Sequence, residues 1–302
     1  MPKTFSSSGA VYFETRDGKH VVSKTIRVEE YNTLVLLKGL PGIVPILELQ
    51  HKGDVYTVVM EKAEFDGIKA ISNPNFKFRS FVQETSRAVA TLHKLKLVHN
   101  DLKLENFLQM KDGHYVLTDF GPTRKIGQTL DIKYTDPRFK APWLHEKNGV
   151  KIKEIQVQPQ MDIYTLGLMY GTVYLGVRKY IKIEIPHVLL GLAEPSPENI
   201  AMLRLLYPKK FEDVDRRIEN SLKKRPDDKE LHEIAKDRNR RNRMILRTIR
   251  REYSASYQKA VAFELEIYAK QGDAHAKLFF DMIQNPETHK IPNIEDIVKH
   301  FT

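Results

Sequence analysis

Short apolar runs separated by turn residues occupy the front of the chain. β-branched and aromatic residues flank the turn dipeptide in Arg16-Asp-Gly18, and this pattern is typical of two strands joined by a tight turn. Leu34 and Leu37 recur at helical spacing, and Gly39 ends that pattern. We predict strands at 11–13, 19–26, 45–50 and 55–60, and a helix at 29–38.

From Phe78 onward the apolar positions change to a helical period. They recur at intervals of three and four, at Phe81, Val82, Thr85, Val89 and Leu92. A small hairpin is predicted at 107–110 and 115–118, turned by Asp112-Gly113, and the pattern beyond Pro159 is mainly helical. A strand-rich front followed by a helical back predicts an α+β fold with two lobes that meet near residues 61–66.

Composition narrows the class of protein. The chain has 302 residues, 41% hydrophobic and 29% charged, which is typical of a folded globular protein. It has no cysteine, so a disulfide framework and a thiolate metal site are excluded. The first residues lack the apolar core of a signal peptide, and no run of about 18 apolar residues occurs. We therefore expect a cytoplasmic protein, or one in a host cytosol if it is a pathogen effector, with no transmembrane segment.

The stretch "VHNDLKLENFL", residues 98–108, carries the groups that phosphoryl transfer needs. That reaction needs a clamped nucleotide, a magnesium ion held by oxygen ligands and a carboxylate beside the attacking hydroxyl. Asp101 offers the carboxylate, Lys103 a charge for the γ-phosphate, and Asn106 an amide oxygen for a metal. Asp119-Phe120-Gly121 follows with a second carboxylate for the metal.

Together these motifs resemble those of the eukaryotic-type protein kinases. His99-x-Asp101-x-Lys103-x-x-Asn106 is similar to the catalytic loop, and Asp119-Phe120-Gly121 to the metal-binding motif. The segment from Asp162 to Gly167 resembles the helix that anchors the catalytic loop from below. The resemblance runs from about residue 4 to residue 301. It implies a bilobal kinase fold with ATP and Mg²⁺ as cofactors, Mn²⁺ being an alternative metal.

The resemblance also implies a nucleotide site. Val22-Ser-Lys24 resembles the strand whose lysine holds the α- and β-phosphates, and Glu30 is the expected partner of Lys24, with Glu29 as the alternative. Met60-Glu-Lys-Ala63 resembles the hinge that contacts adenine. The implied ATP-binding residues are Gly9, Val11, Val22, Lys24, Met60, Glu61, Ala63 and Leu108.

The catalytic loop departs from the family at one position. Asn100 stands where many kinases carry an arginine that pairs with a phosphate on the activation segment. Losing that arginine removes the phosphate-dependent switch but none of the reacting groups. We therefore expect activity that does not depend on phosphorylation of the activation segment, here 122–143.

The N-terminal lobe is reduced. Of the family's three loop glycines only Gly9 remains, and we expect the first strand to be short or missing. Lys24 and Glu30 lie unusually close in sequence, so their pair is the least secure part of the predicted site. We also expect that a lobe this small needs an activating protein partner.

A stretch at about 205–262 has no counterpart in the family. Its centre, 236–251, contains eight basic residues and one acidic residue, and contributes much of the net charge of +10. On a helical wheel one face is basic: Lys236, Arg240, Arg243, Arg247, Arg250 and Arg251. The stretch is either a packed helix with a solvated face or a polyanion site for an inositol polyphosphate, nucleic acid or acidic lipid surface.

The leading hypothesis is a serine/threonine protein kinase built as one domain over 1–302, with a reduced N-lobe at 1–63 and a C-lobe at 64–302. Lys103 is the Ser/Thr-type residue at its position in the family. One alternative is a kinase-fold pseudoenzyme that acts as a binding or scaffold module. Another is a small-molecule or lipid kinase of related fold, because fold does not determine the acceptor.

Overall fold

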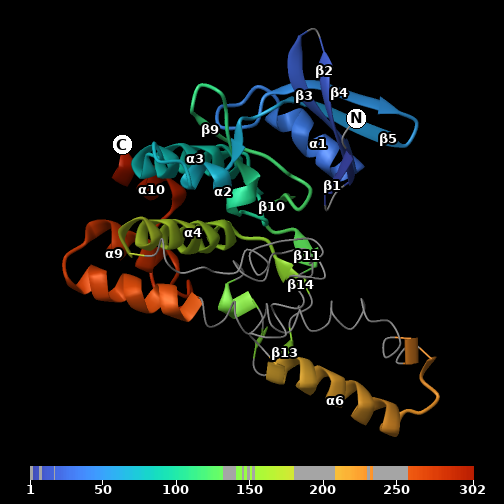
Figure 1. Cartoon of the computed structure of the whole chain (residues 1–302). Coiled ribbons are helices and arrows are strands. Elements are labelled where there is room, and N and C mark those ends of the chain that lie inside the picture. The colour runs from blue at the N-terminus through green and yellow to red at the C-terminus, as the bar shows by residue number, and fades with distance from the viewer. Residues whose placement is uncertain are drawn as a thin grey trace. The chain divides into compact units, whose positions relative to one another are not determined.

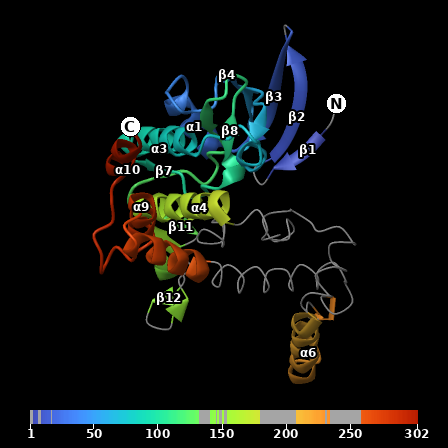
Figure 2. The same cartoon turned by 60° about the vertical axis from the view of Figure 1, so that its left-hand side comes forward.

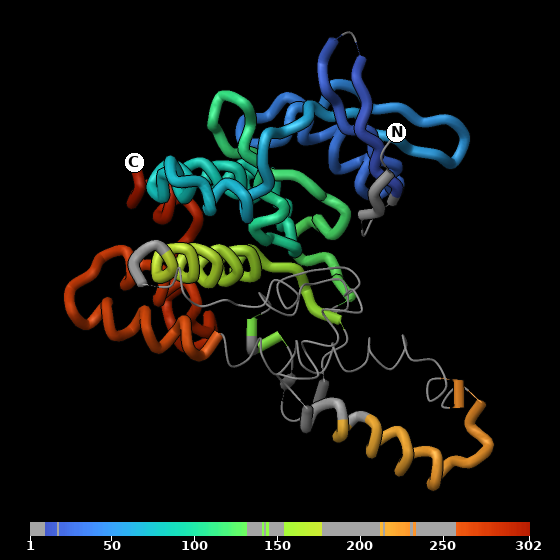
Figure 3. Tube along the Cα trace, in the orientation of Figure 1, coloured from blue at the N-terminus to red at the C-terminus, as the bar shows by residue number. Residues whose placement is uncertain are grey.

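The computed structural model describes residues 3–6, 9–16, 18–131, 141–144, 146–147, 150–151, 154–179, 208–229, 232–233 and 258–302 (Figures 1 and 3). The chain forms two compact units, Met1–Arg178 with Ala260–Thr302, and Lys179–Lys259. The predicted basic stretch overlaps the second unit. The division into one domain with an insertion stays a prediction.

A five-stranded antiparallel sheet forms the front of the first unit, in the order β1-β2-β3-β5-β4. Its strands are β1 Lys3–Ser6, β2 Gly9–Arg16, β3 Lys19–Ile26, β4 Ile46–Lys52 and β5 Val55–Glu61. Helix α1, Val28–Leu37, buries Leu34 and Leu37. The predicted strands and helix are confirmed, and β1 is short, as expected, at four residues.

The connection between α1 and β4 joins the sheet to the helical part of the unit. Val44 N donates to Leu117 O at 2.9 Å, and Leu117 N donates to Gly42 O at 2.8 Å. Gly42 has φ of +77°, and a Cβ there would lie 2.7 Å from Ala88 Cα. Only glycine allows this close approach without strain, so the connection is held directly against the next long helix.

Helices with an aromatic core form the back of the first unit. They are α3 Phe78–Lys94, α4 Pro159–Lys179, α9 Ala274–Met282 and α10 Ile294–Phe301, and residues 258–270 are also helical. Figures 1 and 2 show α10 beside α3, with α4 and α9 beneath them. The rings of Phe81, Tyr170, Phe279 and Phe301 are fully buried and make edge, tilted or stacked contacts. Within the described ranges, no helix is both long enough and apolar enough to cross a membrane.

One buried polar group ties α3 to α4. The Tyr170 hydroxyl lies 2.7 Å from Thr85 Oγ1 and 3.0 Å from Ser86 Oγ. Because buried polar groups are costly when unpaired, these contacts explain why Thr85 and Ser86 are tolerated on the buried face of α3. The helical period predicted for α3 is confirmed, and its buried face includes these two polar residues.

Short elements frame the loop that carries the candidate chemistry. The predicted hairpin is confirmed as β8 Phe107–Gln109 and β9 Tyr115–Leu117, joined at its edge by β6 Phe65–Asp66. The helix α2 Gly67–Ile71, the 3₁₀ turns η1 Leu104–Asn106 and η3 Pro142–Leu144, and the strands β7 Leu97–Val98, β10 Arg124–Lys125, β11 Thr129–Asp131, β12 Glu146–Lys147, β13 Val150–Lys151 and β14 Glu154–Gln156 were not predicted. They are two to five residues long, too short for a hydrophobic period to be recognised.

The described part of the second unit contains α6, Pro208–Lys224. Ile218 is its buried position, and most of its other described side chains are half-buried or exposed. The basic face predicted at 236–251 lies outside the described residues.

Candidate active site

The loop 98–108 is held from below by one buried carboxylate. Asp162 in α4 accepts the backbone N–H of His99 at 2.9 Å and that of Asn100 at 3.0 Å. His93 Nε2 lies 3.0 Å from the same carboxylate. Two backbone amides and one ring therefore converge on Asp162, which is 1% exposed, and the anchoring role expected for the 162–167 segment has a direct structural basis.

His99 connects this loop to the Asp119-Phe120-Gly121 motif. The backbone N–H of Asp101 donates to His99 Nδ1 at 3.3 Å, so Nδ1 is an acceptor and the ring proton is on Nε2. Nε2–H then donates to Thr118 O at 3.1 Å. The ring also meets Phe120 edge-on, with centroids 5.5 Å apart, and both side chains are buried.

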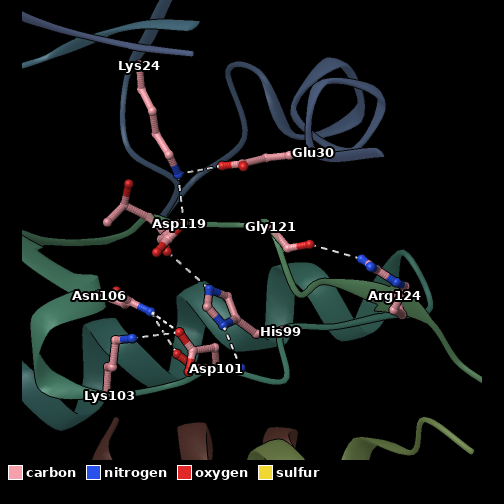
Figure 4. Close-up of polar contacts among 10 residues, drawn as sticks. Lys24, Glu30, His99, Asp101, Lys103, Asn106, Asp119, Gly121 and Arg124 are labelled. Atoms are coloured by element: carbon pink, nitrogen blue, oxygen red, sulfur yellow. Dashed lines mark hydrogen bonds and ion pairs between the residues drawn. The ribbon is translucent and has the colours of Figure 1, made fainter. Parts of the chain in front are cut away.

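Three side chains predicted for the reaction gather on the loop, as Figure 4 shows. Lys103 Nζ lies 2.7 Å from Asp101 Oδ2. Asn106 Nδ2 donates to the backbone oxygen of Asp101 at 2.7 Å and to its Oδ2 at 3.3 Å. The carboxylate of Asp101 is thus held by an ammonium and an amide, an arrangement that fixes its direction beside an incoming hydroxyl.

Lys24 lies at the centre of the second group. Its Nζ is 2.8 Å from Glu30 Oε1 and 2.7 Å from Asp119 Oδ1 (Figure 4). Glu29, the alternative partner, is exposed. The pair expected to be the least secure is formed and buried, with Lys24 5% and Glu30 3% exposed, because the short link between β3 and α1 still turns Glu30 inward.

The electrostatics of this group favour the ionised forms of Lys24 and Asp119, whereas burial raises the pKa of the Glu30 carboxyl group. Burial opposes the charge on Lys24, but attraction to Asp119 and Glu30 outweighs it and raises the pKa of the ammonium. Burial likewise opposes the charge on Asp119, and the adjacent Lys24 outweighs it and lowers the pKa of the carboxyl group. Lys24 therefore remains a cation and Asp119 an anion near neutral pH, as phosphate and metal binding require.

Asn100 fastens the start of the activation segment to the loop. Its Nδ2 donates to Val98 O at 3.0 Å and to Pro122 O at 3.1 Å. Its φ is +66°, a left-handed conformation that asparagine tolerates better than most residues. Asn100 therefore suits this position through both its backbone conformation and its hydrogen bonds.

Arg124 reinforces this connection and was not singled out from the sequence. Its Nη1 donates to Gly121 O at 3.0 Å and to Thr123 O at 2.7 Å. Its strand, β10, pairs with β7 at the start of the loop. No short motif marks Arg124, because its acceptors are backbone carbonyls of the adjoining turn and every residue has a carbonyl.

The predicted nucleotide side lies on the sheet. Val11 pairs with Lys24 across β2 and β3, and Val22 pairs with Met60 across β3 and β5. Met60 is buried, whereas the other predicted contact residues Val11, Val22, Ala63 and Leu108 are half-buried and Glu61 is exposed. Glu61 N donates to Pro45 O at 3.0 Å. Gly9 begins β2, opposite Ser6, and the loop tip at 7–8 lies outside the described residues.

The oxygen donors suit magnesium. Asn106 uses its amide nitrogen on Asp101, so its Oδ1 is the atom directed elsewhere, and Asp119 adds a carboxylate charged at neutral pH. Mg²⁺ is usually bound by one or two carboxylates together with substrate phosphates rather than by a full protein cage. In the described part of the chain no cluster of three or more His, Cys, Asp or Glu residues could hold a metal ion.

The β-rich lobe, the helical lobe, the ion pairs of Lys24 with Glu30 and Asp119, and the anchored loop define a protein-kinase-type fold and site. The family model for the protein kinase domain matches residues 10–191 of this chain. The chain therefore belongs to the protein kinase family, and the predicted bilobal α+β fold is confirmed.

Parts of the chain are similar to several curated kinases. The probable cyclin-dependent kinase 10 of Dictyostelium discoideum is 29% identical over 143 residues, covering 45% of this chain and 38% of that protein. Sperm motility kinase 3A of Mus musculus is 30% identical over 168 residues, covering 50% and 32%. The serine/threonine-protein kinase CST20 of Candida albicans is 25% identical over 195 residues, covering 58% and 15%. The matched segments span less than half the length of each relative.

Proposed function

We propose that the chain transfers the γ-phosphate of ATP to serine or threonine hydroxyl groups of proteins. The observation that carries this proposal is the chain of contacts from Glu30 through Lys24 to Asp119, at 2.8 and 2.7 Å. It joins the sheet, α1 and the metal-binding motif in the arrangement that phosphoryl transfer requires.

In this proposal each residue has one task. Lys24 binds the α- and β-phosphates, and Asn106 and Asp119 supply oxygens to Mg²⁺, which neutralises phosphate charge when bound. Asp101 orients the acceptor hydroxyl and takes its proton as the new oxygen–phosphorus bond forms and the bond to ADP breaks. Lys103 stabilises the charge on the transferred group. Relatives described as serine/threonine kinases support the choice of acceptor.

We further propose that activity does not require phosphorylation of the activation segment. Asn100 and Arg124 supply neutral and cationic donors to carbonyl groups at 121–123, where other kinases use an arginine–phosphate pair. The hydroxyl of Thr123 is itself buried. Phosphatase treatment should therefore leave the rate unchanged. A loss of more than tenfold would contradict this part of the proposal.

The test is transfer of labelled phosphate from ATP to cell-lysate proteins by the wild type, Asp101→Ala and Asp119→Ala. Both variants should lose transfer, and phosphoamino-acid analysis should show phosphoserine or phosphothreonine. A thermal shift that requires both ATP and Mg²⁺ would separate a kinase from a binding module. Labelled lipid or small molecules without labelled protein would favour a different acceptor.

Two further predictions concern regulation. The small size of the N-lobe leads us to expect an activating protein partner. Addition of that partner should raise the rate of phosphate transfer. Polyanion binding by Lys236, Arg240, Arg243, Arg247, Arg250 and Arg251 concerns residues outside the described ranges. It is tested by the effect of an inositol polyphosphate on the rate and the melting temperature.

A further inference from the structure

A groove lies between α3 and α10, on a part of the first unit that contains none of the catalytic residues. Its volume is about 650 Å³, within the range of sites that bind ligands. Both views of the fold show the two helices side by side, with the β8–β9 hairpin near them (Figures 1 and 2). We call this feature the α3–α10 groove.

Helical spacing explains how the groove is built. Its lining residues recur at intervals of three and four in both helices, so each helix contributes one face. Ala90 on α3, Val298 on α10 and Tyr115 on the hairpin give the lining an apolar part. Ala90 and Tyr115 are buried and Val298 is half-buried. The groove therefore offers apolar surface that a side chain of a partner would cover.

Three cations surround this apolar surface. Arg87, Lys94 and Lys299 line the groove and are exposed. None of them forms an ion pair with any residue in the described ranges. Clustered cations that lack partners raise the local potential and attract an anionic ligand.

Two acidic residues, Glu84 and Glu295, also line the groove. Glu84 accepts the backbone N–H of Tyr115 at 2.6 Å and is half-buried. Glu295 lies in the first turn of α10, where the helix dipole favours a negative charge. Both carboxylates keep their charge, and with the three cations they leave the lining with a net charge of +1.

We propose that the α3–α10 groove docks a short acidic segment of a partner protein that carries an apolar anchor residue. The anchor covers Ala90 and Val298, and carboxylates on either side pair with Arg87, Lys94 and Lys299. A peptide fits better than a nucleic acid, because the apolar lining gives no partner to a phosphate backbone but covers an apolar side chain. The groove is a docking surface for a substrate or regulator, separate from phosphate transfer.

The experiment measures fluorescence polarisation of labelled peptides with the full chain and without nucleotide. The probe is Glu-Leu-Glu-Glu-Leu-Glu; the comparison peptides replace every Glu by Lys, or every Leu by Ser. The acidic probe Glu-Leu-Glu-Glu-Leu-Glu should bind at least tenfold more tightly than either comparison peptide. Raising the salt from about 50 to 300 mM should weaken it, because exposed charges are screened.

The variant Arg87→Glu with Lys94→Glu should reduce binding of the acidic probe at least tenfold. Lys19→Glu with Lys52→Glu makes the same charge change on exposed residues of the sheet and should leave the affinity unchanged. Val298→Ser should weaken binding without a charge change. Unchanged melting temperatures and basal kinase rates would show that the site, not the fold, was altered.

Three results would overturn the proposal: equal binding of the Lys-containing peptide, equal loss in the sheet variant, or tighter binding of single-stranded DNA than of the acidic probe. Because the binding assay contains no ATP, its failure would leave the proposed kinase activity intact. A chain inactive in phosphate transfer would still bind the probe if the groove has the proposed role.

Discussion

Asn100 offers the sharpest test of how the activation segment is held. Its amide nitrogen donates to Val98 O and Pro122 O, at 3.0 and 3.1 Å, in a position 8% exposed. Asn100→Asp keeps the shape of the side chain but removes both donors and faces two carbonyl oxygens with a carboxylate. Asn100→Ala removes the amide and also places alanine at φ of +66°. Asn100→Gly removes the amide without the backbone cost.

The structure allows the magnitudes to be worked out. Each of the two hydrogen bonds of Asn100 Nδ2 contributes about 1 kcal/mol to stability. Its Oδ1 is buried without a partner among the described residues, so removing this atom stabilises the fold by about 1 kcal/mol. Asn100→Gly should then lower the free energy of unfolding by ~1 kcal/mol. Asn100→Ala should lower it by ~2 kcal/mol, because a left-handed conformation costs alanine about 1 kcal/mol more. Asn100→Asp should exceed both, at roughly 3 kcal/mol or more, since it buries a charge facing acceptors.

The measurements are urea unfolding and the rate of phosphate transfer. The order of stability should be wild type, Gly, Ala, Asp, and kcat should fall at least tenfold in Asn100→Asp because Pro122 is no longer held. Asn100→Asp with wild-type stability would refute the donor role of the amide. Equal stabilities of the alanine and glycine variants would refute the backbone contribution.

Three further predictions test the helical core and the buried charges. Gly167→Ala should lower the free energy of unfolding by about 1–3 kcal/mol, because the added Cβ would lie 2.6 Å from Met282 Cβ. Gly176→Ala in the same helix is the matched control, because an added Cβ there would have no atom within 4 Å. Urea titration should show that this control variant is as stable as the wild type or more stable. Tyr170→Phe should cost about 1–2 kcal/mol, since its hydroxyl is the buried partner of two others, and a neutral result by calorimetry would show that those hydroxyls find other partners. Lys24→Met should abolish the ATP-dependent thermal shift and lower the free energy of unfolding by about 3 kcal/mol or more, because the buried Glu30 and the half-buried Asp119 lose their cation. An undiminished thermal shift would remove Lys24 from the nucleotide site.

The order and type of the long elements were predictable from the sequence. The strands 19–26 and 55–60 and the helix beginning at Phe78 have clear periods, and most of their apolar residues are buried in the structure. The pairing of Lys24 with Glu30 rather than Glu29 was less predictable. Glu29 and Glu30 are identical side chains at adjacent positions, so the sequence does not separate them. The rotation of α1 against the sheet determines that Glu30 is buried.

The sequence by itself determined the chemistry of this protein: the spacing of Asp101, Lys103 and Asn106, and Asp119 after them, states which groups are available. Tertiary structure decided how those groups are held. The contact of Asn100 with the carbonyl of Pro122, and the groove between α3 and α10, join residues far apart along the chain. Backbone carbonyls and grooves carry no sequence signal, because every residue has a carbonyl and a groove exists only after helices pack.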